Sequence, residues 1–227
     1  MNRLILDALI FDLDGTLIDT MGVYFQTLDV VCERLDLPPV SRKEISDAVK
    51  EGNFNWDLIF PLEMLDKKDG LIKKARVVIE EVDLQIPWHE LEIFPGVREI
   101  LKEIAESDIK IGIVTATPVQ KIEKKLYPLK RAGIAKLLDV IITEDDALRG
   151  KPAADPLIEC GKRLDVEVDK SAYVGDSRVD IKAGKAAGMK TIGVLTGLDD
   201  YDSLKKEDPD LIIDSVVQLR EVIDFIS

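Results

Sequence analysis

The most informative segment of this sequence is Ala8-Leu9-Ile10-Phe11-Asp12-Leu13-Asp14-Gly15-Thr16-Leu17. Its first four residues are apolar, which is typical of a short strand buried on both faces. Two acids follow, Asp12 and Asp14, where the chain must turn. Ligands of open parallel sheets bind outside the carboxyl ends of the strands, so both acids are candidate site residues. Taken alone, Asp14-Gly15 is also a common turn sequence.

Five further apolar runs have the length of buried parallel strands. Helical patterns separate most of them, one beginning after Pro95-Gly96 and another ending at Gly188, a residue type that often terminates helices. This alternation predicts an α/β fold with an open, parallel, doubly wound (Rossmann-like) sheet. The five runs are Ile109–Val114, Val140–Ile142, Ala172–Val174, Thr191–Val194 and Leu211–Ile213.

Residues 18–94 interrupt the alternation, because they contain helix signals and no convincing strand. Ser41 and Glu44 have the spacing of a capping box, and apolar residues recur at helical intervals from Leu71 to Val82. We therefore predict an all-helical cap subdomain at 18–94, inserted into a catalytic core formed by 1–17 and 95–227. Ile93-Phe94-Pro95-Gly96 would form the hinge at its return.

Composition excludes several classes of partner. The chain has 44 acidic and 31 basic residues, and a net charge of −13 repels nucleic acid and anionic membranes. No apolar run approaches the ~18 residues of a membrane span, and residues 1–7 reach Asp7 before any signal-like stretch. We expect a cytoplasmic protein that binds neither nucleic acid nor membrane, as a monomer or a homo-oligomer. Cys32 and Cys160 lack metal-site spacing and should be buried, reduced thiols.

Two more segments carry candidate binding groups. Thr115-Ala116-Thr117-Pro118 follows a predicted strand, and its hydroxyl and backbone N–H groups would suit phosphate oxygens. Alternatively, Thr117 is simply a helix N-cap with Pro118 at the first helical position. Lys151 lies in a loop before Pro152, where it could bind an anion or remain a solvated surface cation.

A fourth segment contains two more acids after a predicted strand. It is Tyr173-Val174-Gly175-Asp176-Ser177-Arg178-Val179-Asp180. Ser177 and Asp180 have capping-box spacing, whereas Asp176 stands directly at the end of a buried strand. His89 is the only histidine and lies outside all of these segments, so we expect it to be structural rather than catalytic.

In their order along the chain, these segments resemble the four motifs of the haloacid dehalogenase superfamily, and the resemblance covers essentially the whole sequence. Closer similarity to phosphoglycolate phosphatases, which carry a helical cap, appears at Leu35–Pro39, Lys151–Leu157 and Val174–Ser177. One departure is Ala116-Thr117-Pro118, where those enzymes often have Asn-Lys-Pro. The motifs are Asp12–Leu17, Thr115, Lys151-Pro152, and Gly175-Asp176-Ser177 with Asp180.

The resemblance implies a magnesium-dependent phosphatase that acts on a small-molecule phosphate ester. Asp12 would attack phosphorus and form an aspartyl-phosphate, while Asp14 would act as general acid and then as general base. Mg²⁺ would be held by a side-chain oxygen of Asp12, the main-chain carbonyl of Asp14 and the carboxylate of Asp176.

The remaining motif residues would assist, again by resemblance. Lys151, Thr115 and the Ala116 N–H would bind the phosphoryl group, and Asp180 would orient metal-bound water or Lys151. Two alternatives stay open at this point. One is a sugar phosphomutase of the β-phosphoglucomutase type, and the other is a non-catalytic binding protein on the same core, against which the intact acids argue.

Overall fold

The computed structural model describes residues 3–50 and 53–225. The chain forms two compact units, one comprising Met1–Asp19 and Trp88–Ser227 and the other Thr20–Pro87. The predicted cap limits, residues 18 and 94, fall just inside the first unit. Ile18 and Ile93 pair there in an antiparallel bridge that joins the two connecting segments. That the second unit acts as a cap stays a prediction.

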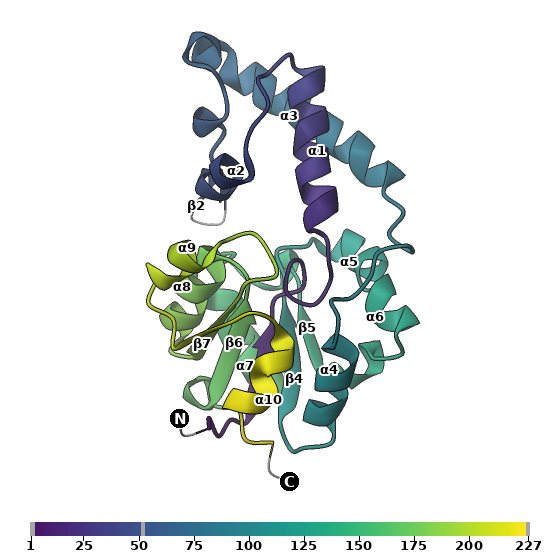
Figure 1. Cartoon of the computed structure of the whole chain (residues 1–227), viewed down its shortest axis with the longest axis vertical. Helices are drawn as coiled ribbons and strands as arrows, with labels where there is room; N and C mark the ends of the chain where they lie inside the picture. The colour runs from purple at the N-terminus through teal and green to yellow at the C-terminus, as the bar shows by residue number, and fades with distance from the viewer. Residues whose placement is uncertain (1–2, 51–52, 226–227) are drawn as a thin grey trace. The chain divides into compact units, whose positions relative to one another are not determined.

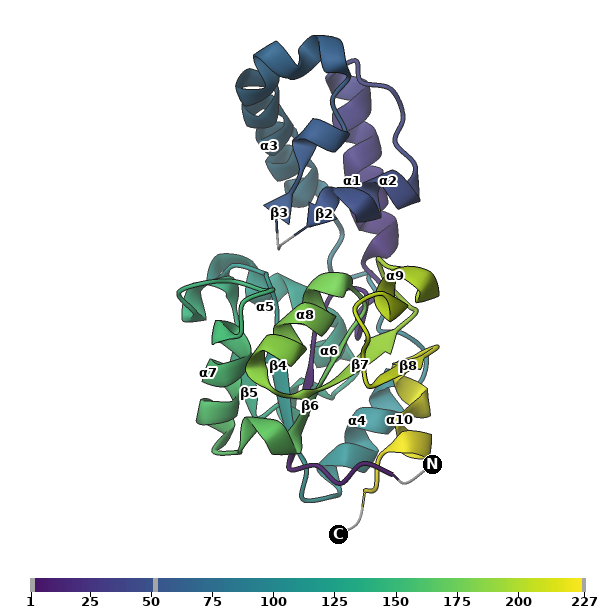
Figure 2. The same ribbon diagram turned by 90° about the vertical axis from the view of Figure 1, so that its left-hand side faces the viewer.

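The first unit contains a six-stranded sheet in the order β5-β4-β1-β6-β7-β8, with all neighbours parallel. All six predicted strands are present, which confirms the doubly wound parallel sheet. The strand order changes direction at β1, which lies between β4 and β6 (Figure 2). The strands are β1 (Ala8–Phe11), β4 (Lys110–Val114), β5 (Val140–Ile142), β6 (Ser171–Gly175), β7 (Lys190–Val194) and β8 (Leu211–Ile213).

Helices cover both faces of this sheet (Figure 1). Leu9 and Phe11 of β1 pack in one core cluster, while Ala8 and Ile10 pack in another. All four side chains are fully buried, which explains why the strand is a continuous apolar run. The first cluster includes residues of α4 (Val97–Ala105), α5 (Val119–Lys125), α6 (Tyr127–Arg131) and α10 (Leu219–Val222), and the second residues of α7 (Asp155–Leu164) and α8 (Arg178–Ala187).

Local signals at the ends of α8 are confirmed. Ser177 and Asp180 form a capping box at its start, and Gly188 ends it in the left-handed conformation with φ of 79°. The unit is completed by α9 (Tyr201–Lys205) and the short 3₁₀ helices η3 (Ala135–Leu137), η4 (Glu144–Asp146), η5 (Val168–Lys170) and η6 (Val216–Gln218).

The second unit is mainly helical. Val31 of α1 (Met21–Arg34) packs with Ala75 and Val78 of α3 (Lys68–Gln85), and the predicted capping box of Ser41 and Glu44 begins α2 (Arg42–Ala48). The helical set is completed by η1 (Trp56–Leu58) and η2 (Leu62–Lys67).

The prediction that this segment is all-helical is wrong in one detail. An antiparallel hairpin is formed by β2 (Val49–Lys50) and β3 (Asn53–Phe54). Strands of two residues are too short to display an alternating pattern, so no sequence pattern predicts them. Residues 51–52, between the two strands, lie outside the described residues, as do 1–2 of the predicted N-terminal segment.

Cys32 and Cys160 are buried, free thiols as predicted, and burial raises the pKa of Cys160 to about 12. Within residues 3–50 and 53–225, no helix is both long and apolar enough to cross a bilayer.

Candidate active site

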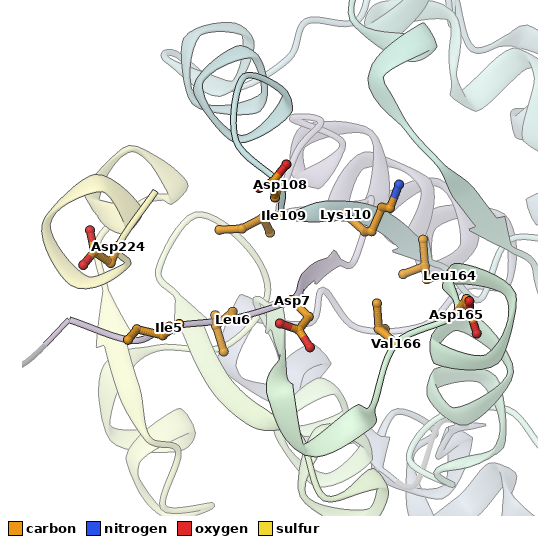
Figure 3. Close-up of a pocket in the computed structure, with 10 residues that line it drawn as sticks. All are labelled: Ile5, Leu6, Asp7, Asp108, Ile109, Lys110, Leu164, Asp165, Val166 and Asp224. Carbon is orange, nitrogen blue, oxygen red and sulfur yellow. The ribbon is translucent and has the colours of Figure 1, made fainter. Parts of the chain in front are cut away.

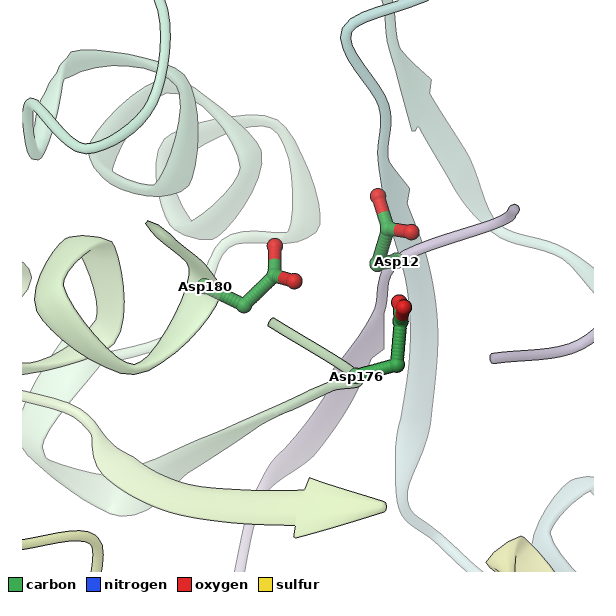
Figure 4. A group of neighbouring side chains, drawn as sticks. All are labelled: Asp12, Asp176 and Asp180. Carbon is green, nitrogen blue, oxygen red and sulfur yellow. The ribbon is translucent and has the colours of Figure 1, made fainter. Parts of the chain in front are cut away.

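Three neighbouring strands end at the candidate site. Asp12 follows β1, Thr115 follows β4 and Asp176 follows β6. Because the strands are adjacent and parallel, their carboxyl ends share one edge of the sheet, where β1 marks the change of strand order. Oxygens of Asp12, Asp176 and Asp180 lie within 4.8 Å of one another, and all three residues are buried (Figure 4).

Lys151 lies among these acids and is not a surface cation. Its Nζ is 2.6 Å from Asp12 Oδ1 and 2.7 Å from Asp180 Oδ1, and its side chain is only 8% exposed. Burial alone would lower the pKa of Lys151, but the Asp12 and Asp180 carboxylates raise it well above its usual value. The lysine is therefore a buried cation held between two carboxylates.

Tyr173 also contacts this lysine, a contact that no pattern in the sequence predicts. Its hydroxyl is 2.9 Å from Lys151 Nζ and 3.1 Å from both Asp180 Oδ1 and the Val114 carbonyl oxygen. In the sequence, Tyr173 reads as one more apolar member of a buried strand. Only the pairing of β6 with its neighbours brings the hydroxyl to Lys151.

Asp180 has two structural tasks at once. Its Oδ2 accepts hydrogen bonds from the Ser177 N–H at 3.1 Å and the Ser177 hydroxyl at 2.5 Å, which forms the cap of α8. Its Oδ1 pairs with Lys151. The helix-capping and site interpretations of Asp180 therefore describe the same side chain.

Asp176 is fixed by hydrogen bonds to both of its oxygens. Oδ1 accepts from the Thr16 hydroxyl at 3.1 Å, and Oδ2 accepts from the Leu198 N–H at 2.7 Å. The surrounding loops approach so closely that a Cβ at Gly15 would lie 2.6 Å from Oδ2, and one at Gly197 only 1.9 Å. Gly15 also has φ of +76°, so the turn after β1 requires glycine on both counts.

That turn presents Asp14 to a different set of partners. Oδ2 of Asp14 lies 2.5 Å from Lys125 Nζ and 3.4 Å from the Thr117 hydroxyl. Thr117 is not the helix N-cap that was one alternative, because α5 begins at Val119. Instead, the Thr117 N–H donates to the Thr115 hydroxyl oxygen at 3.1 Å, while Ala116 between them is exposed. The sequence offered no signal for Lys125.

The charges of the cluster call for a further cation. Burial raises the pKa of Asp12 to about 7, although Lys151 opposes the shift. Burial, with the negative charges of Asp180 and Asp12, raises the pKa of Asp176 well above its usual value. One lysine thus faces three buried acids. Hard carboxylate oxygens in this number suit Mg²⁺, so the residues present fit such an ion.

This imbalance predicts how stability depends on pH without metal. When folding raises the pKa of a carboxyl group, the folded state becomes less stable as the pH rises from the pKa in the unfolded chain to the pKa in the folded chain. For Asp12 these two pKa values are 3.8 and about 7. In EDTA the melting temperature should therefore fall between pH 5 and 7. Asp176→Asn should melt several °C higher than the parent at pH 8, at about 2–4 °C per kcal/mol for a chain of this size.

Added Mg²⁺ distinguishes this electrostatic effect from a change in stability that has another cause. Added Mg²⁺ should raise the melting temperature of the parent protein and of a control, Asp7→Asn, at the opposite end of β1, but should have little effect on Asp176→Asn. An Asp176→Asn protein that melts below the parent in EDTA at pH 8, and is still stabilised by Mg²⁺, would refute this interpretation.

Two other features lie away from this cluster. A pocket lined by Leu6, Asp7, Ile109, Lys110 and other residues opens at the amino ends of β1 and β4, opposite Asp12 (Figure 3). His89 is exposed, lies 3.6 Å from Glu90 and packs edge-on against the ring of Tyr127. Neither contributes a group to the carboxyl edge of the sheet.

The chain is similar to known hydrolases and phosphatases. The sequence model of the haloacid dehalogenase-like hydrolases matches residues 9–194. A phosphorylated carbohydrates phosphatase of Thermotoga maritima is 32% identical over 203 residues, which cover 88% of this chain and 90% of the relative. A phosphoglycolate phosphatase of Salmonella paratyphi A is 27% identical over 223 residues, which cover 90% and 87%.

A solved structure agrees in fold. It is described as a predicted phosphoglycolate phosphatase from Haemophilus somnus 129pt, and it matches with a TM-score of 0.79 at 18% identity, covering 96% of this chain and 97% of the other. At this identity the likeness shows the shared α/β fold.

Proposed function

The chain belongs to the haloacid dehalogenase-like hydrolase family, and from this premise we propose that it is a magnesium-dependent phosphatase of small-molecule phosphate monoesters. The observation that carries the proposal is the position of Asp12. It stands at the end of the strand where the sheet order changes direction, 2.6 Å from a buried lysine and beside a second buried acid, Asp176.

The reaction needs an attacking group and a proton donor. Asp12 attacks phosphorus, the bond from phosphorus to the leaving oxygen breaks, and that oxygen takes a proton from Asp14. Water then attacks the phosphoryl group on Asp12 and gives a proton to Asp14 as the bond from phosphorus to Asp12 breaks. The sum converts one ester and one water into one alcohol and one hydrogen phosphate, and restores both acids.

Other residues bind the phosphoryl oxygens. Lys151 is already cationic and shielded from solvent, so its charge acts in a medium where electrostatic interactions are strong. Thr115 and the Ala116 N–H follow the neighbouring strand and would bind the remaining oxygens. Asp180 and the Tyr173 hydroxyl hold the lysine in place.

Magnesium would be held by Asp12, Asp176 and the main-chain carbonyl of Asp14. When bound, the ion would neutralise negative charge on the phosphoryl group and on the acids around it. Asp180 belongs to the same cluster, but Lys151 and Ser177 already occupy its two oxygens, so we assign it to orienting the lysine.

Phosphoglycolate is our first choice of substrate, and one relative carries that name. The other relative is named for phosphorylated carbohydrates, so a panel of esters is the appropriate test. Phosphoglycolate, hexose phosphates and p-nitrophenyl phosphate should be compared for phosphate release. Conversion of one sugar phosphate into its isomer without phosphate release would instead support a phosphomutase. No reaction with any of the esters would support a binding protein.

Metal dependence is a separate prediction. Activity on the best ester should be lost in EDTA and restored by Mg²⁺, with Mn²⁺ as a substitute, because the cluster offers hard oxygen ligands. Ca²⁺ should bind but support little turnover, since its larger and looser coordination sphere would misplace the attacking group. A melting curve in EDTA checks that the protein stays folded. Full turnover in metal-free buffer would contradict the proposal.

A further inference from the structure

A second lysine, Lys125, holds the Asp14 carboxylate. Lys125 is the last residue of α5, and its Nζ lies 2.5 Å from Asp14 Oδ2. The two side chains are only 19% and 25% exposed, so the ion pair is partly shielded from solvent and should be stronger than a surface pair. The Thr117 hydroxyl lies 3.4 Å from the same oxygen.

The two oxygens of Asp14 differ. Oδ2 has these partners, whereas Oδ1 is buried and has no hydrogen-bond partner among the described residues. Leaving a buried acceptor without a partner is unfavourable, so Oδ1 marks a position where a bound molecule supplies the partner. Oδ1 is therefore the oxygen that the substrate or the attacking water would meet.

Lys125 is itself held from a second direction. Its Nζ lies 5.3 Å from the centre of the Trp88 ring, within the range of a cation–π contact. Lys124, the preceding residue, contacts the same ring at 5.1 Å. Lys125 pairs with Asp14, and Lys124, its neighbour on the same ring, provides a matched comparison.

We propose that Lys125 is a positioning residue for Asp14, a role that rests on the proposed acid–base function of that aspartate. The terminal torsion of an aspartate is broad, so the carboxylate would rotate if nothing held it. By binding Oδ2, Lys125 keeps Oδ1 directed at the leaving oxygen. The proton passes from Oδ1 to that oxygen in the first step, and from water back to Oδ1 in the second.

The test compares esters that need an acid with one that does not. Lys125→Met should lower kcat/KM for glycerol phosphate by about 10-fold or more, which is part of the usual contribution of acid–base catalysis. Its leaving group is an alkoxide that must be protonated and that carries no other charge. The value for p-nitrophenyl phosphate should change little, since its leaving group departs unprotonated, and this also shows that the variant is folded. Lys124→Met is the matched control and should behave as the parent. Lys125→Arg should restore part of the loss.

A double variant distinguishes this proposal from the function on which it rests. In an Asp14→Asn background, Lys125→Met should cause no further loss of kcat/KM, because both changes remove the same step, proton transfer by Asp14. Independent, multiplying losses would overturn the positioning role, as would equal effects of Lys124→Met and Lys125→Met. A loss confined to phosphoglycolate, whose leaving group is anionic, would make Lys125 a substrate-binding cation instead. An Asp14→Asn variant with full activity on glycerol phosphate would refute the acid–base function itself.

Discussion

Asp12→Asn should release no measurable phosphate from any ester, a loss of at least about 10³-fold, or about 4 kcal/mol of transition-state stabilisation. The amide has nearly the shape of the carboxylate but is a poor nucleophile and cannot form the phosphoanhydride. The fold should survive, because Lys151 keeps its pairing with Asp180 at 2.7 Å and a buried anion is removed. Steady-state phosphate release and a melting curve measure the two effects.

The matched control is Asp7→Asn. Asp7 precedes the same strand at its amino end, half-exposed, and its side chain lies 3.9 Å from Lys170. The same chemical change there should leave activity intact. Retention of a tenth of the parent activity by Asp12→Asn would rule out covalent catalysis through Asp12.

Asp14→Asn should trap the phosphoenzyme when the substrate is p-nitrophenyl phosphate. The phenolate leaves without a proton, so the first step proceeds, but the attacking water has lost its base. Hydrolysis of the phosphoanhydride on Asp12 should then slow by about 10² to 10⁴, the usual worth of acid–base catalysis. Rapid mixing should show a burst of p-nitrophenol near one equivalent of enzyme, and mass spectrometry should find phosphate on Asp12.

Asp19→Asn is the control for this variant, because it makes the same change at an exposed acid five residues further along. It should give a linear trace at the parent rate. If Asp14→Asn also gave a linear trace at that rate, Asp14 would be neither acid nor base, and the turn after β1 would be its whole role.

Many elements of the first unit could be predicted because a buried parallel strand appears in the sequence as a short, continuous run of apolar residues. Ala8–Phe11 packs against both helical layers, so all of its residues must be apolar and the strand stands out in the sequence. Acids directly after such strands lie at the ligand-binding edge of the sheet, which makes Asp12 and Asp176 site candidates. The hairpin of β2 and β3 was missed because strands of two residues carry no periodicity.

The class of fold, the edge of the sheet where the acids gather and the family to which their order belongs could all be predicted from the sequence. These depend on local patterns and on the rule that parallel strands end together. Which groups are in contact follows from the folded chain alone. Lys125 reaches Asp14 across 111 residues of sequence, and Tyr173 reaches Lys151 from a strand whose sequence is typical of the core. Such contacts depend on side-chain direction and helix placement, which no spacing along one chain encodes.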